Sequence, residues 1–123
     1  MKTSACNILD ILANLRISSV CEEYDIHALI ADALAAGGIA FEHEYKLAPH
    51  KRAYFFCNGT VIEVKKGKPA RSMLIKQISG YLQCSETVDM IVVTQRHIPL
   101  PAAIAGKPVY QLALDRLWGV ALP

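Results

Sequence analysis

The chain has 123 residues, of which 53% are apolar and 20% are charged, and its formal net charge is +2. This length predicts one domain, residues 1–123, with a single core, and the composition excludes a largely disordered chain. With no apolar run of about 18 residues and no apolar secretory signal at the N-terminus, we expect a cytoplasmic protein without a membrane segment.

Two helices are expected at the start of the domain. Apolar residues recur at helical spacing over residues 8–15, which predicts a short helix in an N-terminal extension, residues 1–18. Residues 19–22 then match a capping box, Ser-x-x-Glu, and predict the start of a second helix. That helix should run to about Ala36, because two glycines follow it.

Three strands should follow as an antiparallel meander. Residues 39–47 alternate between apolar and polar side chains, as in a half-buried strand, and residues 48–51 read as a turn. An Asn-Gly pair then separates residues 53–57 from residues 60–65, which is typical of a two-residue hairpin.

A crossover helix and a buried strand complete the predicted core. The helix begins after Pro69, and its buried side is expected to carry Met73, Leu74, Ile78, Tyr81 and Leu82. Residues 88–94 are apolar and β-branched, as in a strand that runs parallel to its neighbour after a right-handed crossover. A loop, a short strand over residues 108–113 and an irregular end make up residues 98–123. The sequence thus predicts an α/β domain with a small mixed sheet flanked by helices.

Positive charge is concentrated in the middle of the chain. Between residues 46 and 76 lie eight of the 13 basic residues and a single acid, Glu63: the bases are Lys46, Lys51, Arg52, Lys65, Lys66, Lys68, Arg71 and Lys76. Such a basic segment in a nearly neutral chain is typical of a localised anionic partner, such as nucleic acid or a phosphorylated ligand. A solvated lysine-rich surface is the alternative.

The predicted hairpin gathers polar residues on one face of the sheet. A two-residue turn pairs Tyr54 with Glu63 and Arg52 with Lys65, so that all four side chains share a face. The opposite face is expected to carry Ala53, Phe55, Ile62 and Val64. Glu63 could ligate a divalent metal while Lys65 orients a water molecule, or the two could form an ordinary ion pair on a solvated face.

Two helices could add to this constellation. Glu22 and Glu23 lie near the apolar stripe of the second helix, so either carboxylate could reach a site between helix and sheet, although Glu22 also fits a capping role. Gln77 and Tyr81 are spaced i, i+4 on the crossover helix and share a face, although Tyr81 could also be a core aromatic with an exposed hydroxyl.

Together these motifs resemble the PD-(D/E)XK nuclease superfamily. The resemblance covers residues 20–97 and rests on Glu23, on Ile-Glu-Val-Lys at residues 62–65, and on Gln77 with Tyr81, which match the Gln-x-x-x-Tyr motif of the exonuclease-like branch. It implies a restriction-endonuclease-like αβββαβ core, DNA or RNA as the partner, and phosphodiester hydrolysis assisted by Mg²⁺ or Mn²⁺.

The resemblance also implies roles for individual residues. Glu63, Lys65 and Glu23 would be catalytic, and Glu63 and Glu23 would hold the metal. The residues expected to bind substrate are Arg52, Tyr54, Lys66, Lys68, Arg71, Gln77 and Tyr81. The departure is Tyr54, which stands where the family carries a metal-bridging Asp, and a neutral phenol is a poor ligand for a hard cation. A four-residue turn at 48–51 would put His43 on the site face as a substitute ligand, and a shift of one residue would put Glu44 there.

Two hypotheses follow for the function. The first is a divergent, metal-dependent nuclease whose missing acid comes from Glu44, from His43 or from a second subunit. The alternative is a catalytically degenerate nuclease fold, a pseudoenzyme, that binds DNA, RNA or a protein partner without cleavage. Dimerisation is a further option for a domain of this size, and the apolar residues 112–122 are a candidate interface.

Overall fold

The computed structural model describes residues 4–15 and 23–119, and the side chains of residues 4, 23–25 and 117–119 lie outside the description. This part of the chain forms a mixed α/β fold with four helices and a six-stranded sheet in the order β1-β2-β3-β4-β6-β5. The elements are α1 (Ser4–Leu12), α2 (Glu23–Ala36), β1 (Glu42–Ala48), β2 (Lys51–Cys57), β3 (Thr60–Lys65), α3 (Arg71–Leu82), β4 (Asp89–Thr94), β5 (Ala103–Ile104), β6 (Lys107–Ala113) and α4 (Leu114–Gly119). None of the helices in the described ranges is long and apolar enough to span a bilayer.

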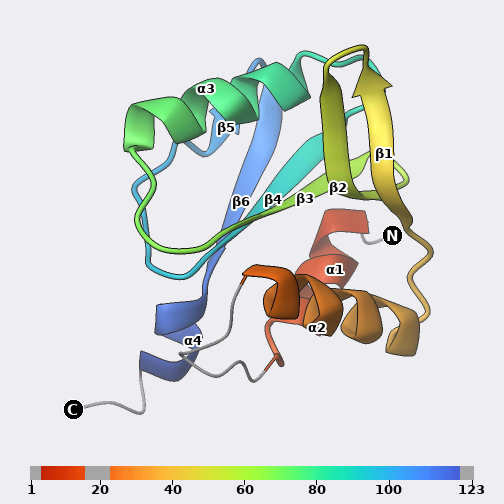
Figure 1. Cartoon of the computed structure of the whole chain (residues 1–123), viewed down its shortest axis with the longest axis vertical. Coiled ribbons are helices and arrows are strands. Elements are labelled where there is room, and N and C mark those ends of the chain that lie inside the picture. The colour runs from red at the N-terminus through yellow and green to blue at the C-terminus, as the bar shows by residue number, and fades with distance from the viewer. Residues whose placement is uncertain (1–3, 16–22, 120–123) are drawn as a thin grey trace.

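The sheet lies between two layers of helices, with α3 on one face and α1 and α2 on the other (Figure 1). The core beneath α1 and α2 is built around Ile8, Leu12, Ile26, Ile30, Leu34, Phe55, Ile62, Val64, Ile91 and Val93. The core beneath α3 is built around Ala53, Phe56, Val61, Leu74, Ile78, Leu82, Met90 and Val92. Strand β4 is buried along its whole length because both layers cover it, as its apolar sequence predicts.

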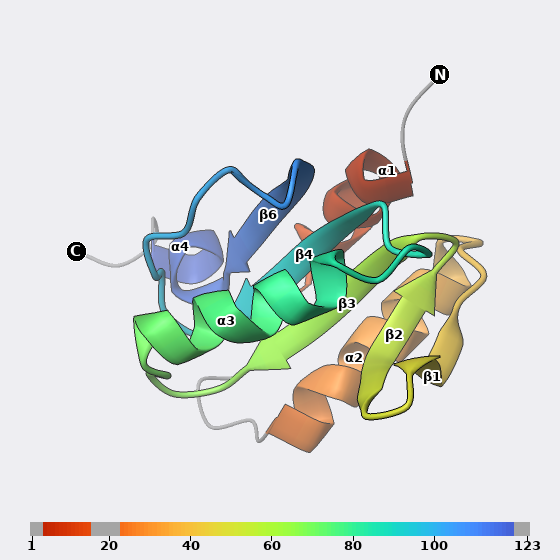
Figure 2. The same cartoon turned by 90° about the horizontal axis from the view of Figure 1, so that it is seen from above.

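The order of helices and strands is confirmed from α2 to β4. Asn58 and Gly59 both have positive φ, 48° and 102°, as a type I′ hairpin turn requires. Strand β2 is antiparallel to β1 and β3, whereas β4 is parallel to β3 and returns through α3. Strand β6 is also parallel to β4, which extends the sheet beyond the core (Figure 2).

The predictions for Met73 and for the C-terminal region are wrong. Met73 is 68% exposed, because it lies about 100° around the helix from Leu74 and outside the buried stripe of α3. The C-terminal region contains β5, which has only two residues, and α4, where an irregular end is predicted. Elements this short leave no readable hydrophobic period in the sequence. The capping box at 19–22 lies outside the described residues.

The β1–β2 ribbon changes faces half-way along its length. Residues i and i+2 of a strand normally share a face, yet His43 packs with Phe55 on the α2 side while Tyr45 stacks on Phe56 on the α3 side. Between them Glu44 has a φ of +54°, in the left-handed region. This change of faces at Glu44 also explains why Ala53 faces α3, whereas the sequence predicts that it shares a face with Phe55.

Asp89 is a buried carboxylate at the start of β4, 5% exposed, and accepts a hydrogen bond of 2.6 Å from the hydroxyl of Thr60 on β3. Burial raises the pKa of Asp89 above its ordinary value, although the Thr60 hydrogen bond acts in the opposite direction. The folded chain therefore binds this proton more tightly than the unfolded chain. Stability falls as the pH rises through the unfolded and then the folded pKa, and stays lowered above them.

Asp89→Asn should therefore make the protein more stable at pH 7, since an amide oxygen can still accept the Thr60 hydrogen bond without a charge to bury. The difference from the wild type should shrink as the pH is lowered through the folded pKa of Asp89. Urea unfolding at a series of pH values measures it, with Asp89→Ala as the control that removes the hydrogen bond as well. A stability difference that does not change with pH would contradict the prediction.

Candidate active site

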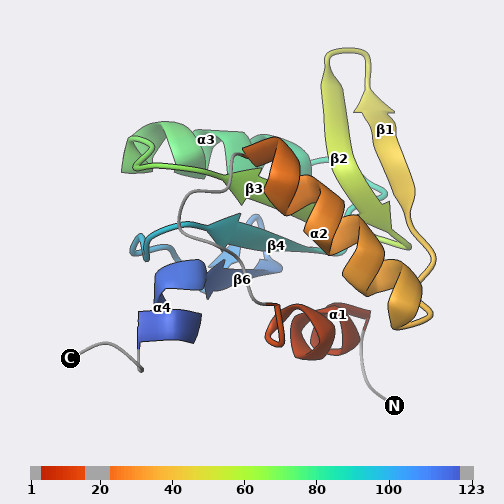
Figure 3. The same cartoon turned by 60° about the horizontal axis from the view of Figure 1, so that its bottom comes forward.

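A pocket opens where β2 separates from β3. The ladder between these strands pairs Cys57 with Thr60, Phe56 with Val61 and Phe55 with Ile62, and within the described chain it ends there. The predicted pairs Tyr54–Glu63 and Arg52–Lys65 are therefore not formed. The β1–β2 hairpin instead rises away from β3 (Figures 1 and 3). The resulting cavity of about 210 Å³, here called the fork pocket, is lined by His27, Glu44, Arg52, Tyr54, Glu63, Val64 and Tyr81.

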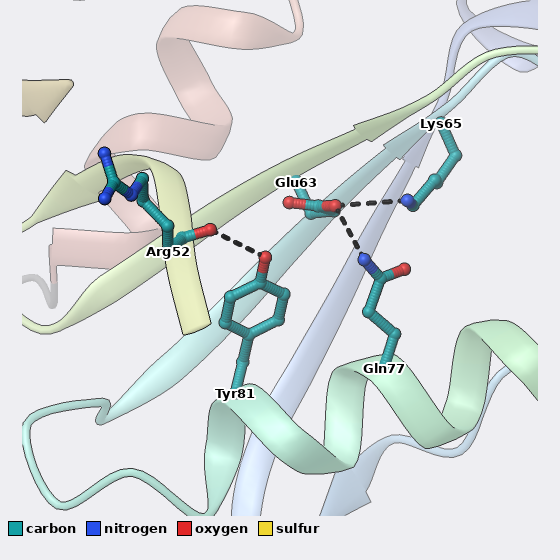
Figure 4. Close-up of polar contacts among 5 residues, drawn as sticks. All are labelled: Arg52, Glu63, Lys65, Gln77 and Tyr81. Atoms are coloured by element: carbon teal, nitrogen blue, oxygen red, sulfur yellow. Dashed lines mark hydrogen bonds and ion pairs between the residues drawn. The ribbon is translucent and has the colours of Figure 1, made fainter. Parts of the chain in front are cut away.

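Glu63 is the buried acid of the fork pocket, with 9% of its surface exposed. Its Oε2 lies 3.2 Å from Nζ of Lys65 and accepts a hydrogen bond of 3.3 Å from Nε2 of Gln77 (Figure 4). Lys65 reaches the carboxylate because residues two apart on a strand share a face, and Gln77 reaches it from α3, which covers that same face of the sheet. Burying a carboxylate is costly unless it is paired and hydrogen-bonded, and these two contacts offset that cost.

Tyr81 connects α3 to β2 at the edge of the pocket. Its hydroxyl donates a hydrogen bond of 2.9 Å to the carbonyl oxygen of Arg52 (Figure 4). Burial, together with the nearby charge of Glu63, raises the pKa of Tyr81 to about 12. The phenol therefore stays protonated at physiological pH and acts as a neutral donor that fixes β2 beside Glu63.

Tyr54 lies in an aromatic stack. The imidazole of His27, from α2, lies parallel to its ring with the centroids 3.7 Å apart, and His43 meets the same ring edge-on at 4.2 Å. Tyr54, which stands where an Asp is expected, is therefore packed between α2 and β1, and it also lines the fork pocket. Sequence spacing alone did not mark His27 as a neighbour of Tyr54.

Glu44, and not His43, faces Glu63 across the fork pocket. The β1–β2 turn is shorter than predicted, since Ala48 pairs with Lys51, and the register shifts between Lys46 and Ala48. This shift moves His43 toward α2 and brings Glu44 to the pocket, where its carboxylate lies 3.9 Å from the guanidinium of Arg52. Both side chains are more than half exposed, so this ion pair is weak.

A basic groove runs along α3 beside the pocket. The groove has a volume of about 980 Å³ and contains three lysines, Lys51 from β2, Lys65 from β3 and Lys76 from α3. Lys51 lies over the ring of Tyr81, 5.5 Å from its centroid, and Gly80 leaves room for it beside the helix. The sequence marked these lysines only as part of a basic segment, and neither Lys51 nor Lys76 was among the expected substrate-binding residues.

The remaining predicted residues lie farther along the chain from the pocket. Lys66 and Lys68 follow β3 in the loop to α3, and they do not line the groove. Arg71 begins α3 and donates a hydrogen bond of 2.6 Å to the carbonyl oxygen of Pro99. Glu23 begins α2, but its side chain lies outside the described part of the chain. Among described side chains, no three His, Cys, Asp or Glu residues form a ready-made metal site.

No family model, curated protein or solved structure matches this chain.

The left-handed backbone of Glu44 can be tested through stability. For a residue other than glycine this conformation costs about 1–2 kcal/mol, whereas glycine adopts it freely. We expect Glu44→Gly to be more stable than Glu42→Gly by about 1 kcal/mol or more. Glu42 is the matched control, because it is an exposed glutamate of the same strand without a positive φ. Urea unfolding measures both variants, and equal destabilisation would contradict the prediction.

Proposed function

We propose that this chain is a divergent protein of the PD-(D/E)XK nuclease superfamily, with a restriction-endonuclease-like core, that hydrolyses phosphodiester bonds of nucleic acid with a divalent metal in the fork pocket. One observation carries the proposal: two carboxylates, Glu44 and Glu63, line the same pocket, and Lys65 lies 3.2 Å from the second of them. Tyr54 stands where the resemblance expects an Asp, so β2 supplies no acid to the pocket. Glu44, from β1, supplies a carboxylate instead.

The donor atoms of the pocket fit a hard divalent cation. Mg²⁺ keeps several water molecules in proteins and is commonly held by one or two carboxylates together with substrate phosphate oxygens. Glu63 and Glu44 would supply the two carboxylates, and Glu23, at the start of α2, is a further candidate. A bound Mg²⁺ or Mn²⁺ would polarise the phosphoryl oxygen and lower the pKa of a coordinated water molecule.

The chain's own residues have separate parts in this reaction. Lys65 would hold the attacking water beside Glu63 and compensate the negative charge that develops on the phosphate. Gln77 keeps the Glu63 carboxylate in position from α3, and Tyr81 keeps β2 in position through the carbonyl group of Arg52. The guanidinium of Arg52 lies on the pocket and could bind a phosphate oxygen once substrate displaces its weak pair with Glu44.

The metal and the cleavage reaction give the direct test. Calorimetric titration of Mn²⁺ should detect binding to the wild type, and Glu63→Gln or Glu44→Gln should weaken that binding about tenfold or more, since each removes a charged ligand. Lys65→Ala should lower the rate of cleavage of DNA or RNA about 10²- to 10⁴-fold. Glu42→Gln is the matched control, because it removes a glutamate of β1 that does not line the pocket. Unchanged metal binding in both pocket variants would exclude this site.

The alternative is a degenerate nuclease fold that binds DNA, RNA or a protein partner without cleavage. The observation that favours it is the stack of Tyr54 on His27, which fills with an aromatic ring the position that the resemblance assigns to a metal-bridging acid. Tyr54→Asp separates the two functions. Cleavage that is absent in the wild type and gained in this variant would establish a lost active site. The cytoplasmic location and a homodimer stay predictions.

Binding of nucleic acid through the basic groove should depend steeply on salt. Each lysine that neutralises a phosphate contributes about −0.7 to −0.9 to the slope of log K against log salt concentration. Lys51→Glu and Lys76→Glu should each make the slope shallower by about that amount, and Lys107→Glu, which lies outside the groove, should not. Fluorescence anisotropy with a labelled oligonucleotide measures these slopes. The same series should include Lys66, Lys68 and Arg71, and binding that survives every charge reversal would contradict a nucleic-acid partner.

A further inference from the structure

A second pocket lies on the far side of Tyr54, between α2 and the β1–β2 hairpin. Its volume is about 340 Å³, at the lower end of the range for small-molecule sites. This surface, here called the aromatic pocket, is lined by His27, Ala28, Ala31, Phe41, His43, Tyr54 and Phe55. It is formed almost entirely by flat rings and by the small side chains of α2.

The rings of this pocket are fixed by contacts with one another. Tyr54 is stacked on His27 and met edge-on by His43, and Phe41 meets Phe55 edge-on with the centroids 5.4 Å apart. Phe55 is fully buried and holds the group on the core. Aromatic walls that are already in place lose little conformational entropy when they bind a flat ligand.

The aromatic pocket adjoins the fork pocket, because the stacked rings of His27 and Tyr54 form a wall of both. The fork pocket offers the guanidinium of Arg52 to a phosphate, and Lys65 lies beside this pocket, 3.2 Å from the Glu63 carboxylate. The aromatic pocket offers ring faces and two imidazoles with polar edges. A ligand that fills both needs an anionic group joined to a flat heterocycle. A nucleotide unit of a nucleic-acid strand has this chemistry.

We infer that the aromatic pocket accepts one unpaired nucleobase of the strand whose phosphate lies in the fork pocket. The inference rests on the proposed function and adds a substrate class to it: single-stranded nucleic acid, or an unpaired end. A base within a duplex is paired and stacked and cannot enter such a pocket, whereas an unpaired base can stack on Tyr, Phe or His rings.

Two variants test the pocket without touching the fork pocket. Ala31→Phe fills the aromatic pocket from α2, and Phe41→Leu removes one ring while keeping an apolar side chain. Each should weaken binding of a single-stranded DNA oligomer about 5- to 150-fold, the loss of one base-stacking contact. Ala36→Phe is the control, because Ala36 is exposed on α2 and lines neither pocket. Thermal unfolding establishes that each variant is folded.

Two oligomers, one with bases and one without, separate binding of a base from binding of the phosphate backbone. Anisotropy is measured in EDTA, which prevents cleavage, with an oligothymidylate and with an abasic oligomer of equal length and charge. The inference predicts that the wild type prefers the oligomer with bases, and that Ala31→Phe and Phe41→Leu remove this preference while abasic binding is unchanged. Equal binding of both oligomers by the wild type would overturn the inference and leave the proposed function standing. Binding of neither oligomer, in EDTA and again with Ca²⁺ in place of the proposed metal, would overturn both.

Discussion

The candidate site depends on the point at which β2 leaves β3. After the Phe55–Ile62 pair, β3 continues in the centre of the sheet beside β4, while β2 turns away with β1 (Figure 3). Two neighbouring strands that stayed paired would leave no cavity between them. The left-handed backbone of Glu44 makes this departure possible, because it lets the hairpin rotate so that Tyr45 packs toward α3 while His43 packs toward α2. The same rotation turns Glu44 and Tyr54 toward Glu63.

The electrostatics of the site follow from where Glu63 is held. A carboxylate on a central strand would be unfavourable if it were unpaired, and Lys65 and Gln77 compensate it from the same face of the sheet. This arrangement orients the carboxylate, yet it also places a cation next to any metal that Glu63 would hold. Glu44 has the opposite character, since it is exposed and only weakly paired. The two carboxylates therefore differ in role: Glu63 is held in a fixed position, and Glu44 is exposed and only weakly paired.

How far the sequence predicts this structure depends on whether a feature is local. The Asn-Gly hairpin, the buried β4 and the crossover helix each have a signal within a few residues, and all three are found. That Glu63 and Lys65 share a face follows from strand periodicity alone. Other features depend on how the hairpin packs against α2 and α3. They are the register of β1, the change of faces at Glu44 and the stacking of His27 on Tyr54. Period-two reasoning assumes a regular ribbon, so it assigns His43 to the place that Glu44 takes.

Tyr54 lines two of the surfaces that this fold brings together, the fork pocket and the aromatic pocket. An aspartate at this position would add charge to the fork pocket but would leave His27 without its stacking partner and the aromatic pocket without one wall. With tyrosine, the same position contributes a ring face to both pockets, while the lysines of the groove supply positive charge that would attract a phosphate backbone. A tyrosine at this position thus favours contact with a flat ring over binding of a cation. Because Glu44 supplies a second carboxylate from the neighbouring strand, a pocket of this kind would combine a ring wall that can stack on a base with two acids that can hold a metal.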